Sequence, residues 1–251
     1  MSDHDLGPLY AQKLRLGAPP GERLIEPVSQ IDAERLIEEN IRLRLDLQNA
    51  DRRTSRLEEL ATRDELTGLG NFRAFKEDYT SAINALERVR YAIINNKPDA
   101  DIALKYTIIG IDCDRFKTQR NDKYGYAYGS AYLVSMARLV ELTLQRSDDT
   151  AYRYGGDEYS ILAPNADHDF VEQWEARVNT QIKQDGPRLF RYQGPIEREG
   201  RIEQNAVVDD VPEFSHASYT LTPHDMPTLQ EVETHIKAGI SKMKAERGVG
   251  R

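Results

Sequence analysis

The 251-residue sequence is acidic, with a formal net charge of −8, and 30% of its residues are charged while 39% are hydrophobic. This composition predicts a globular protein with one domain and an extension, and the negative charge argues against a long nucleic acid as partner. A single cysteine excludes an internal disulfide. Since no apolar run has the length of a membrane span and the acidic start lacks a signal-peptide pattern, we expect no membrane contact and a cytoplasmic location.

The N-terminal part of the chain has two segments of different composition. Residues 1–30 contain several Gly and Pro and predict an irregular arm. Residues 31–63 contain neither and are rich in Glu, Arg and Leu, which predicts a helix. A heptad seam along it favours a homodimer through a short coiled coil over a single amphipathic helix packed on its own domain. The seam consists of Leu36, Asn40, Leu43, Leu47, Ala50, Thr54, Leu57 and Ala61.

A compact domain is expected over residues 64–251, where helical and strand patterns alternate. The class is therefore α/β or α+β, with helices on a central sheet. Residues 186–214 are polar and contain Gly and Pro, which predicts a surface hairpin or insertion. The expected helices cover residues 72–90, 127–145, 169–184 and 229–247, and the expected strands cover residues 105–112, 150–154, 159–162 and 215–222.

Acidic residues follow two of the expected strands. Between residues 150–154 and 159–162, the pair Gly155-Gly156 predicts a tight turn, and Asp157 and Glu158 come directly after it. Taken alone, this pattern is equally compatible with an ordinary turn that carries solvated charges. A buried strand ends at Asp112, however, and two such carboxylates on adjacent strands would repel each other without a cation between them. The pattern therefore predicts a site for a divalent metal, which binds oxygen ligands.

Three separate motifs, in order along the chain, resemble those of the GGDEF-domain, or diguanylate cyclase, family. The segment Asp-Glu-Leu-Thr-Gly-Leu-Gly-Asn-Phe-Arg at residues 64–73 resembles the opening signature of that family. Residues 112–129 resemble its nucleotide-binding motif, and Arg-Tyr-Gly-Gly-Asp-Glu-Tyr at residues 153–159 resembles its signature hairpin, with Tyr in place of Phe. The resemblance runs from about residue 64 to residue 247.

The resemblance implies a GGDEF/nucleotide-cyclase-like fold, in which a central, mostly antiparallel sheet is flanked by helices and preceded by an N-terminal helix. It also implies an activity, the joining of two nucleoside triphosphates into a cyclic 3′,5′-dinucleotide with release of pyrophosphate. The enzyme of this family acts as a homodimer in which each subunit holds one triphosphate. The implied cofactor is Mg²⁺ or Mn²⁺, and the implied substrate is GTP.

The resemblance further implies roles for single residues. Asp112, Asp157 and the backbone carbonyl of Cys113 would bind the metal, with Glu158 in the same acidic centre. The thiol of Cys113 is expected to pack inertly and not to act as a nucleophile. Among the substrate-binding positions, Asn121 corresponds to the residue that reads guanine. These positions are Phe116, Lys117, Asn121, Ser130, Gly155, Gly156, Lys244 and Arg247.

A feedback site is also implied. Arg146 and Asp149 fit the Arg-x-x-Asp inhibitory motif of the family at the expected distance before the hairpin. An Arg fork recognises phosphate or a guanine edge, and an Asp accepts hydrogen bonds from guanine. We expect an allosteric site for the cyclic dinucleotide product here; the alternative is a solvated helix end.

The sequence departs from the family pattern at three places. Ser130 replaces an Asp that accepts hydrogen bonds from guanine, which resembles a hybrid, promiscuous subgroup that makes cyclic GMP-AMP from GTP and ATP; the alternative is a neutral change that leaves GTP preferred. Three residues instead of two separate Lys117 from Asn121, so a shifted loop is expected. Arg247 lies one place before the expected arginine, and we expect it to substitute imperfectly.

Two other function classes compete with the enzyme. One is a non-enzymatic receptor that binds cyclic di-GMP at Arg146 and Asp149, and the other is a scaffold whose coil is the functional part. The presence of Asp112, Asp157 and Glu158 favours the cyclase, because degenerate members of the family usually lose the acidic hairpin.

Overall fold

The computed structural model describes residues 30–97 and 103–249. The arm expected over residues 1–30 lies outside this part, except for Gln30. By its contacts the chain divides into two compact units, residues 1–54 and 55–251. Within the described ranges, no helix is long and apolar enough to cross a membrane.

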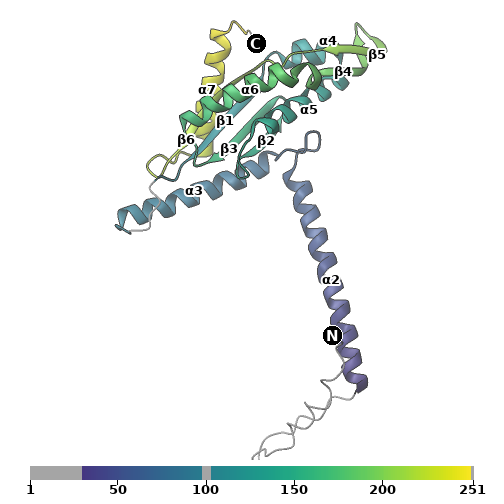
Figure 1. Ribbon diagram of the computed structural model, residues 1–251, viewed down its shortest axis with the longest axis vertical. Coiled ribbons are helices and arrows are strands. Elements are labelled where there is room, and N and C mark those ends of the chain that lie inside the picture. Colours follow the sequence, from purple (N-terminus) through teal and green to yellow (C-terminus); the bar gives the residue numbers. More distant parts are fainter. Residues whose placement is uncertain (1–29, 98–102, 250–251) are drawn as a thin grey trace, which may run out of the picture. The chain divides into compact units, whose positions relative to one another are not determined.

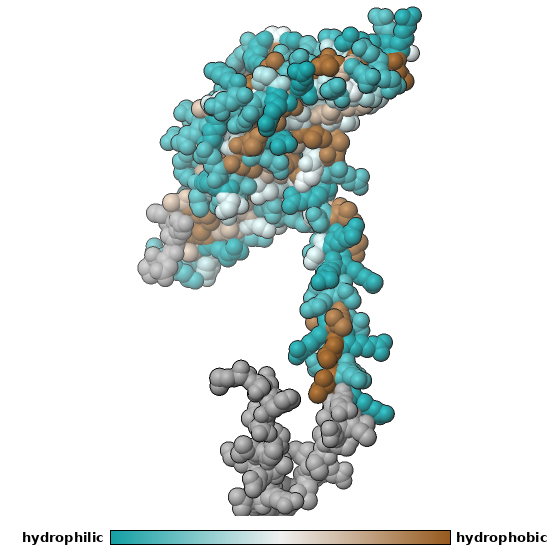
Figure 2. Space-filling model, turned by 45° about the vertical axis from the view of Figure 1, so that its right-hand side comes forward, coloured by the Kyte–Doolittle hydropathy of each residue, from teal (hydrophilic) through white to brown (hydrophobic). Residues whose placement is uncertain are grey.

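Helix α2 spans Gln30–Thr62, within one residue of the helix expected from the sequence. Leucine and isoleucine side chains lie on its surface, as Figure 2 shows, and Leu43 and Leu47 are 60% and 62% exposed. Within the described part of the chain, no other segment covers these side chains. The homodimer expected through this helix stays a prediction.

The central sheet of residues 55–251 has four strands in the order β2-β3-β1-β6, and every neighbouring pair is antiparallel. Its middle strand β1 contains the apolar run Ile108 to Ile111, which is fully buried because both faces of the sheet are covered. The mostly antiparallel sheet expected from the sequence is confirmed. The strands are β1 (Tyr106–Cys113), β2 (Thr150–Gly155), β3 (Glu158–Pro164) and β6 (Phe214–Leu221).

Two helices cover each face of this sheet (Figure 1). Successive side chains of a strand point to opposite faces. Ile109 therefore packs with the cluster under α5 and α6, while Ile108 packs with the cluster under α3 and α7. The helices are α3 (Phe72–Ile94), α5 (Tyr126–Thr143), α6 (His168–Leu189) and α7 (Leu229–Glu246).

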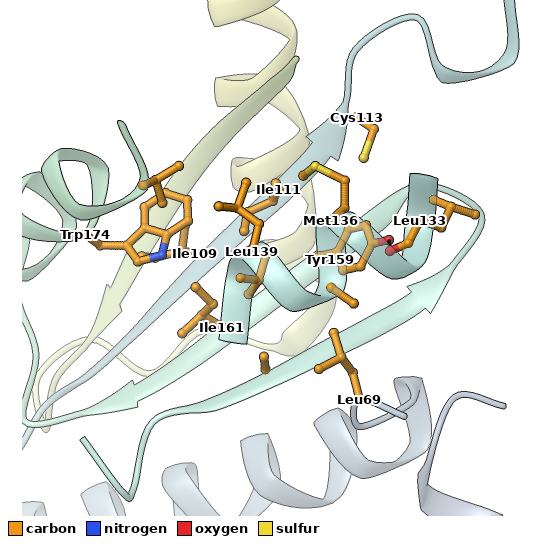
Figure 3. Packing of buried hydrophobic residues seen from close by; sticks show 14 of the residues in the cluster. Leu69, Ile109, Ile111, Cys113, Leu133, Met136, Leu139, Tyr159, Ile161 and Trp174 are labelled. Carbon is orange, nitrogen blue, oxygen red and sulfur yellow. Dashed lines mark hydrogen bonds between the residues drawn. The ribbon is translucent and has the colours of Figure 1, made fainter. Parts of the chain in front are cut away.

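The larger core lies between the sheet and helices α5 and α6. Figure 3 shows Ile109, Ile111 and Ile161 from the strands together with Leu139 of α5 and Trp174 of α6. The indole N–H of Trp174 donates to the hydroxyl of Thr143 at 3.0 Å, so its one polar group is satisfied inside the core.

The segment expected as a surface insertion differs from the prediction at its start. Helix α6 continues through Gly186 and Pro187 to Leu189, so the end expected at residue 184 was wrong. Because Gly186 has no Cβ, the steric restriction that a proline places on its preceding residue is relaxed there, and the buried Phe190 anchors the helix end. The hairpin itself is a separate two-stranded sheet, β4 (Arg191–Arg198) with β5 (Arg201–Asp209).

Two short helical segments connect β1 to α5. A π-helical turn, η1 (Lys117–Asn121), leads into the short α4 (Asp122–Tyr124). The β4–β5 hairpin packs on α4 and on α5. It therefore lies beside the segment that carries the expected nucleotide-binding motif.

Candidate active site at the turn between β2 and β3

The glycine pair forms the exposed turn between β2 and β3. Gly155 has a φ of 131° and Gly156 a φ of 57°, which side chains rarely tolerate. A Cβ on either residue would meet no atom within 4 Å, so it is the backbone conformation that requires glycine, and the space above the turn is open. Behind it, Tyr159 is buried and donates its hydroxyl to the carbonyl of Leu133 at 2.7 Å. The turn is thus anchored to α5.

Three carboxylates gather at this end of the sheet. Asp112 of β1 is paired directly across from Glu158 of β3, so these two side chains share one face. Asp157 lies in the turn, and its backbone carbonyl accepts a hydrogen bond from the N–H of Cys113 at 3.1 Å. Burial raises the pKa of Asp157, and the charge of Asp112 raises it further. The acids expected to meet are therefore close enough to repel one another.

Two cations from the end of α7 face these acids. The ammonium of Lys244 forms an ion pair with Asp112 and lies 3.8 Å from Asp114. Arg247 donates to Asp114 at 3.0 Å and to the carbonyl of Phe214 at 2.6 Å. Arg247 thus reaches the strand that carries the acids. Sequence reasoning missed Asp114, which is fully buried and holds Arg247 in place.

The nucleotide-binding motif wraps around the N-terminus of α5. Phe116 is buried, whereas Lys117 is exposed at the start of η1. A Cβ on Gly129 would lie 1.8 Å from Oδ1 of Asn121, so the Asn121 amide rests directly on the α5 backbone. Ser130 follows Gly129 and is half-buried. The structure therefore brings Asn121 next to the turn of α5 that carries Ser130.

The donor atoms at this end of the sheet match a hard divalent cation. A magnesium ion bound with a nucleotide usually takes one or two carboxylates from the protein, and phosphate or water supplies the rest. Asp112 and Asp157 provide two such carboxylates. In the described residues no group of three or more His, Cys, Asp or Glu side chains is arranged to hold a metal. Burial raises the pKa of the Cys113 thiol, and the neighbouring acids add to this, so it stays protonated.

A second polar cluster surrounds Asp149. Arg146 Nε lies 3.2 Å from Oδ1 of Asp149, whose side chain is fully buried. The guanidinium groups of Arg146 and Arg177 lie over the Phe170 ring, at 4.7 and 5.6 Å from its centroid. Burial raises the pKa of Asp149 although Arg146 opposes this. Sequence reasoning missed Arg177, although its spacing from Phe170 and Trp174 on α6 indicates a shared helix face.

Several polar atoms of this cluster lack hydrogen bonds. Both carboxylate oxygens of Asp149 and the Nη2 atoms of Arg146 and Arg177 are buried without one, although Oδ1 of Asp149 keeps its ion pair with Arg146. Buried polar groups are normally hydrogen-bonded, so such a group of orphaned donors and acceptors needs an explanation.

Comparison with known proteins identifies the family. Residues 61–196, more than half of the chain, match the family described as diguanylate cyclase, GGDEF domain. The chain is 29% identical to diguanylate cyclase VdcA of Vibrio cholerae over 139 residues, which are 55% of this chain and 35% of that protein. It is 33% identical to diguanylate cyclase DgcM of Escherichia coli over 119 residues, which are 47% of this chain and 25% of that protein.

A solved structure has the same fold. The coiled coil and GGDEF domain of DgcB from Caulobacter crescentus, in complex with c-di-GMP, aligns with a TM-score of 0.57 at 17% identity, covering 85% of this chain and 95% of that one. The chain spans about a third or less of the length of the curated relatives it matches. By the family match over more than half of its length, the chain belongs to the GGDEF diguanylate cyclase family.

Proposed function

We propose that this protein condenses two molecules of GTP into cyclic di-GMP and releases two pyrophosphates. The observation that carries the proposal is the gathering of Asp112, Asp157 and Glu158 at an open glycine turn, with Lys244 beside them. Acidic groups next to a backbone that a phosphate can approach are what metal-assisted phosphoryl transfer requires.

Each side chain of the site has a task in this reaction. Asp112 and Asp157, with the carbonyl of Cys113, would hold Mg²⁺ or Mn²⁺, and Glu158 would complete the acidic centre. The bound metal lowers the pKa of a coordinated hydroxyl and offsets charge on phosphate. Lys244 and Arg247 bring positive charge to the acidic centre, where they would bind the β- and γ-phosphates.

The choice of base is assigned to Asn121 and Ser130. The Asn121 amide offers one acceptor and two donors to a purine edge, and the Ser130 hydroxyl both donates and accepts. A carboxylate at position 130 would favour guanine, whereas a hydroxyl does not discriminate in this way. We therefore propose cyclic GMP-AMP, made from GTP and ATP, as a second product, on the observation of Ser130 alone.

Assembly and regulation complete the proposal. A homodimer through α2 would bring two triphosphates together, and the exposed leucines of that helix support it. The cyclic dinucleotide would bind at Arg146, Asp149 and Arg177, where its phosphates and guanine N–H groups would satisfy the orphaned polar atoms.

Product analysis tests the proposal. The full chain is incubated with Mg²⁺ and either GTP alone or equal GTP and ATP, and the products are identified by mass spectrometry. We expect a cyclic dinucleotide from the wild-type protein and a loss on the order of a thousandfold in D157N. The matched control D148N makes the same chemical change at an exposed acid before the other end of β2 and should keep full activity. A dimeric wild-type protein that makes no product, yet binds cyclic di-GMP through Arg146, would be a receptor.

A further inference from the structure

The most completely buried cation of the described residues is Arg120, which is 1% exposed. Its guanidinium donates to the carbonyl of Asp114 at 2.8 Å, to Asp210 at 3.1 Å and to the carbonyl of Val211 at 3.2 Å. It also lies over the ring of Tyr132, at 4.5 Å from the centroid. Burying a charge is costly unless it is paired and fully hydrogen-bonded. These partners therefore offset the cost of burying the guanidinium.

The backbone of Arg120 belongs to a turn that needs outside support. In η1 the N–H of Asp122 donates to the carbonyl of Lys117, which is the spacing of a π-helix. Such turns are rare and arise when one extra residue is inserted into a helical stretch. Just before the turn, Arg115 has a φ of 52°, a conformation that costs energy for a residue with a side chain.

The residue after Arg120 is Asn121, whose side chain is closely packed against Gly129 of α5. A Cβ on Gly129 would lie only 1.8 Å from Oδ1 of Asn121, so this side chain packs directly against the glycine. A shift of η1 would therefore move the Asn121 amide relative to the α5 backbone at Gly129.

The anion that holds Arg120 also holds α5. The Asp210 carboxylate accepts a hydrogen bond from the hydroxyl of Tyr128 at 2.5 Å, one residue before Gly129. Asp210 follows directly after β5, and its N–H donates to the carbonyl of Phe190 at 3.2 Å, at the base of the β4–β5 hairpin. One carboxylate thus bridges η1, which contains Asn121, and the start of α5.

We propose that Arg120 is a positioning residue for base recognition, and that its pairing with Asp210 holds the π-turn so that Asn121 stays against Gly129. This inference rests on the proposed function, because it takes Asn121 as the residue that reads the purine. Arg120 itself is buried against Asp210 and Val211, so its proposed effect is exerted through Asn121. Asp210, which follows β5, thereby contributes to nucleotide affinity.

The test uses R120M, D210N and the double variant in the full chain. We expect each single variant to raise the KM for GTP about tenfold with kcat within about twofold, because positioning is lost while the acidic centre is intact. The double variant should raise the KM by less than the product of the two single effects, since the Arg120–Asp210 pair is shared by both variants. Amide hydrogen exchange over residues 117–125 should become faster in all three.

The neighbouring pair Arg191 and Asp209 supplies matched controls. These side chains lie on the same hairpin, 3.8 Å apart, and are 61% and 69% exposed. R191M and D209N make the same chemical changes without touching η1, so the KM for GTP and the exchange rates should stay at wild-type values. If R120M does not fold, D210N decides, because it keeps the size of the side chain. An unchanged KM in folded D210N, or an equal rise in the controls, overturns the inference.

Failure of the proposed cyclase activity can be distinguished from failure of the positioning role of Arg120. A wild-type protein that forms no dinucleotide refutes the cyclase activity. Binding of the α,β-methylene analogue of GTP, measured by calorimetry, then decides between the variants. A weaker affinity in D210N but not in D209N supports the positioning role, while equal affinities or no binding by the wild-type protein overturn it.

Discussion

Gly129 lies where a single methyl group would displace Asn121, the residue proposed to read the base. In the variant G129A the new Cβ would meet Oδ1 of Asn121 at 1.8 Å, so the amide must turn away. We expect the KM for GTP to rise about tenfold. Stability should hold or increase, because Ala is favoured over Gly inside a helix by about 1 kcal/mol. Steady-state kinetics and thermal unfolding measure the two effects.

The control for this variant is G186A in helix α6. There a Cβ would meet Cγ2 of Ile182 at 3.5 Å, which is ordinary contact, so the KM should not change. A wild-type KM in G129A would show that Asn121 does not read the base.

Ser130 is the residue to which we assign the proposed choice of product. The variant S130D introduces a carboxylate that accepts hydrogen bonds from guanine N–H groups and matches adenine poorly. In equal GTP and ATP, we expect a larger share of cyclic di-GMP than the wild-type protein gives, measured by mass spectrometry. The variant S130A removes only the hydroxyl and should not shift the products toward cyclic di-GMP. An unchanged product ratio in S130D would assign the selection to Asn121 alone.

At the scale of elements, one ion pair connects the segment after α2 to the turn between β2 and β3. Arg153 of β2 donates to both carboxylate oxygens of Asp64, at 2.9 and 3.0 Å, and to the carbonyl of Gly156 at 2.6 Å. Asp64 follows α2 after one residue, and Asn71 donates to the carbonyl of Ala61 within that helix. The variant D64N should therefore cost about 2 kcal/mol of unfolding free energy at neutral pH, since Arg153 loses a charged partner.

The pH dependence of this loss follows from the pKa of Asp64. Burial alone would raise that pKa, but hydrogen bonds from Thr67 and Arg153 outweigh it and hold it below the ordinary value of 3.8. The ionised carboxylate thus stabilises the folded state fully above pH 3.8, and this contribution disappears as the pH falls through the lower folded pKa. Denaturant unfolding of wild-type protein and D64N should give curves that converge below pH 3.8. A difference that persists there would mean that the charge is not involved.

The elements differ in how far the sequence predicts them. The apolar run of β1 and the glycine pair of the β2–β3 turn are local signals, and the structure has them within a residue or two of the predicted positions. The end of α6 was wrong because a Gly-Pro pair normally ends a helix. The pairing of Arg120 could not be predicted from the sequence, because its partner Asp210 lies 90 residues further along the chain. Only the fold brings such partners together.

For the whole molecule, the family match and the structure concern mainly one of its two units. The residues of the proposed active site all lie in one of these units, residues 55–251. The last turns of α2 belong with the catalytic unit because the N–H of Asn71 donates to Thr62 and its side chain to Ala61.

The seam of α2 gives the prediction at this scale. In L43E/L47E, two seam residues become charged, and like charges facing each other across a coiled coil oppose pairing. We expect a monomer by light scattering and a product rate at least tenfold lower at equal concentration, because two triphosphates no longer meet. Thermal unfolding of the catalytic unit should be unchanged, since these side chains are exposed. The matched variant I41E/L45E has the same spacing and similar exposure but lies off the seam, so it should remain dimeric and active. Equal loss in both variants would contradict the heptad register, and full activity of a monomeric L43E/L47E would contradict catalysis by a dimer.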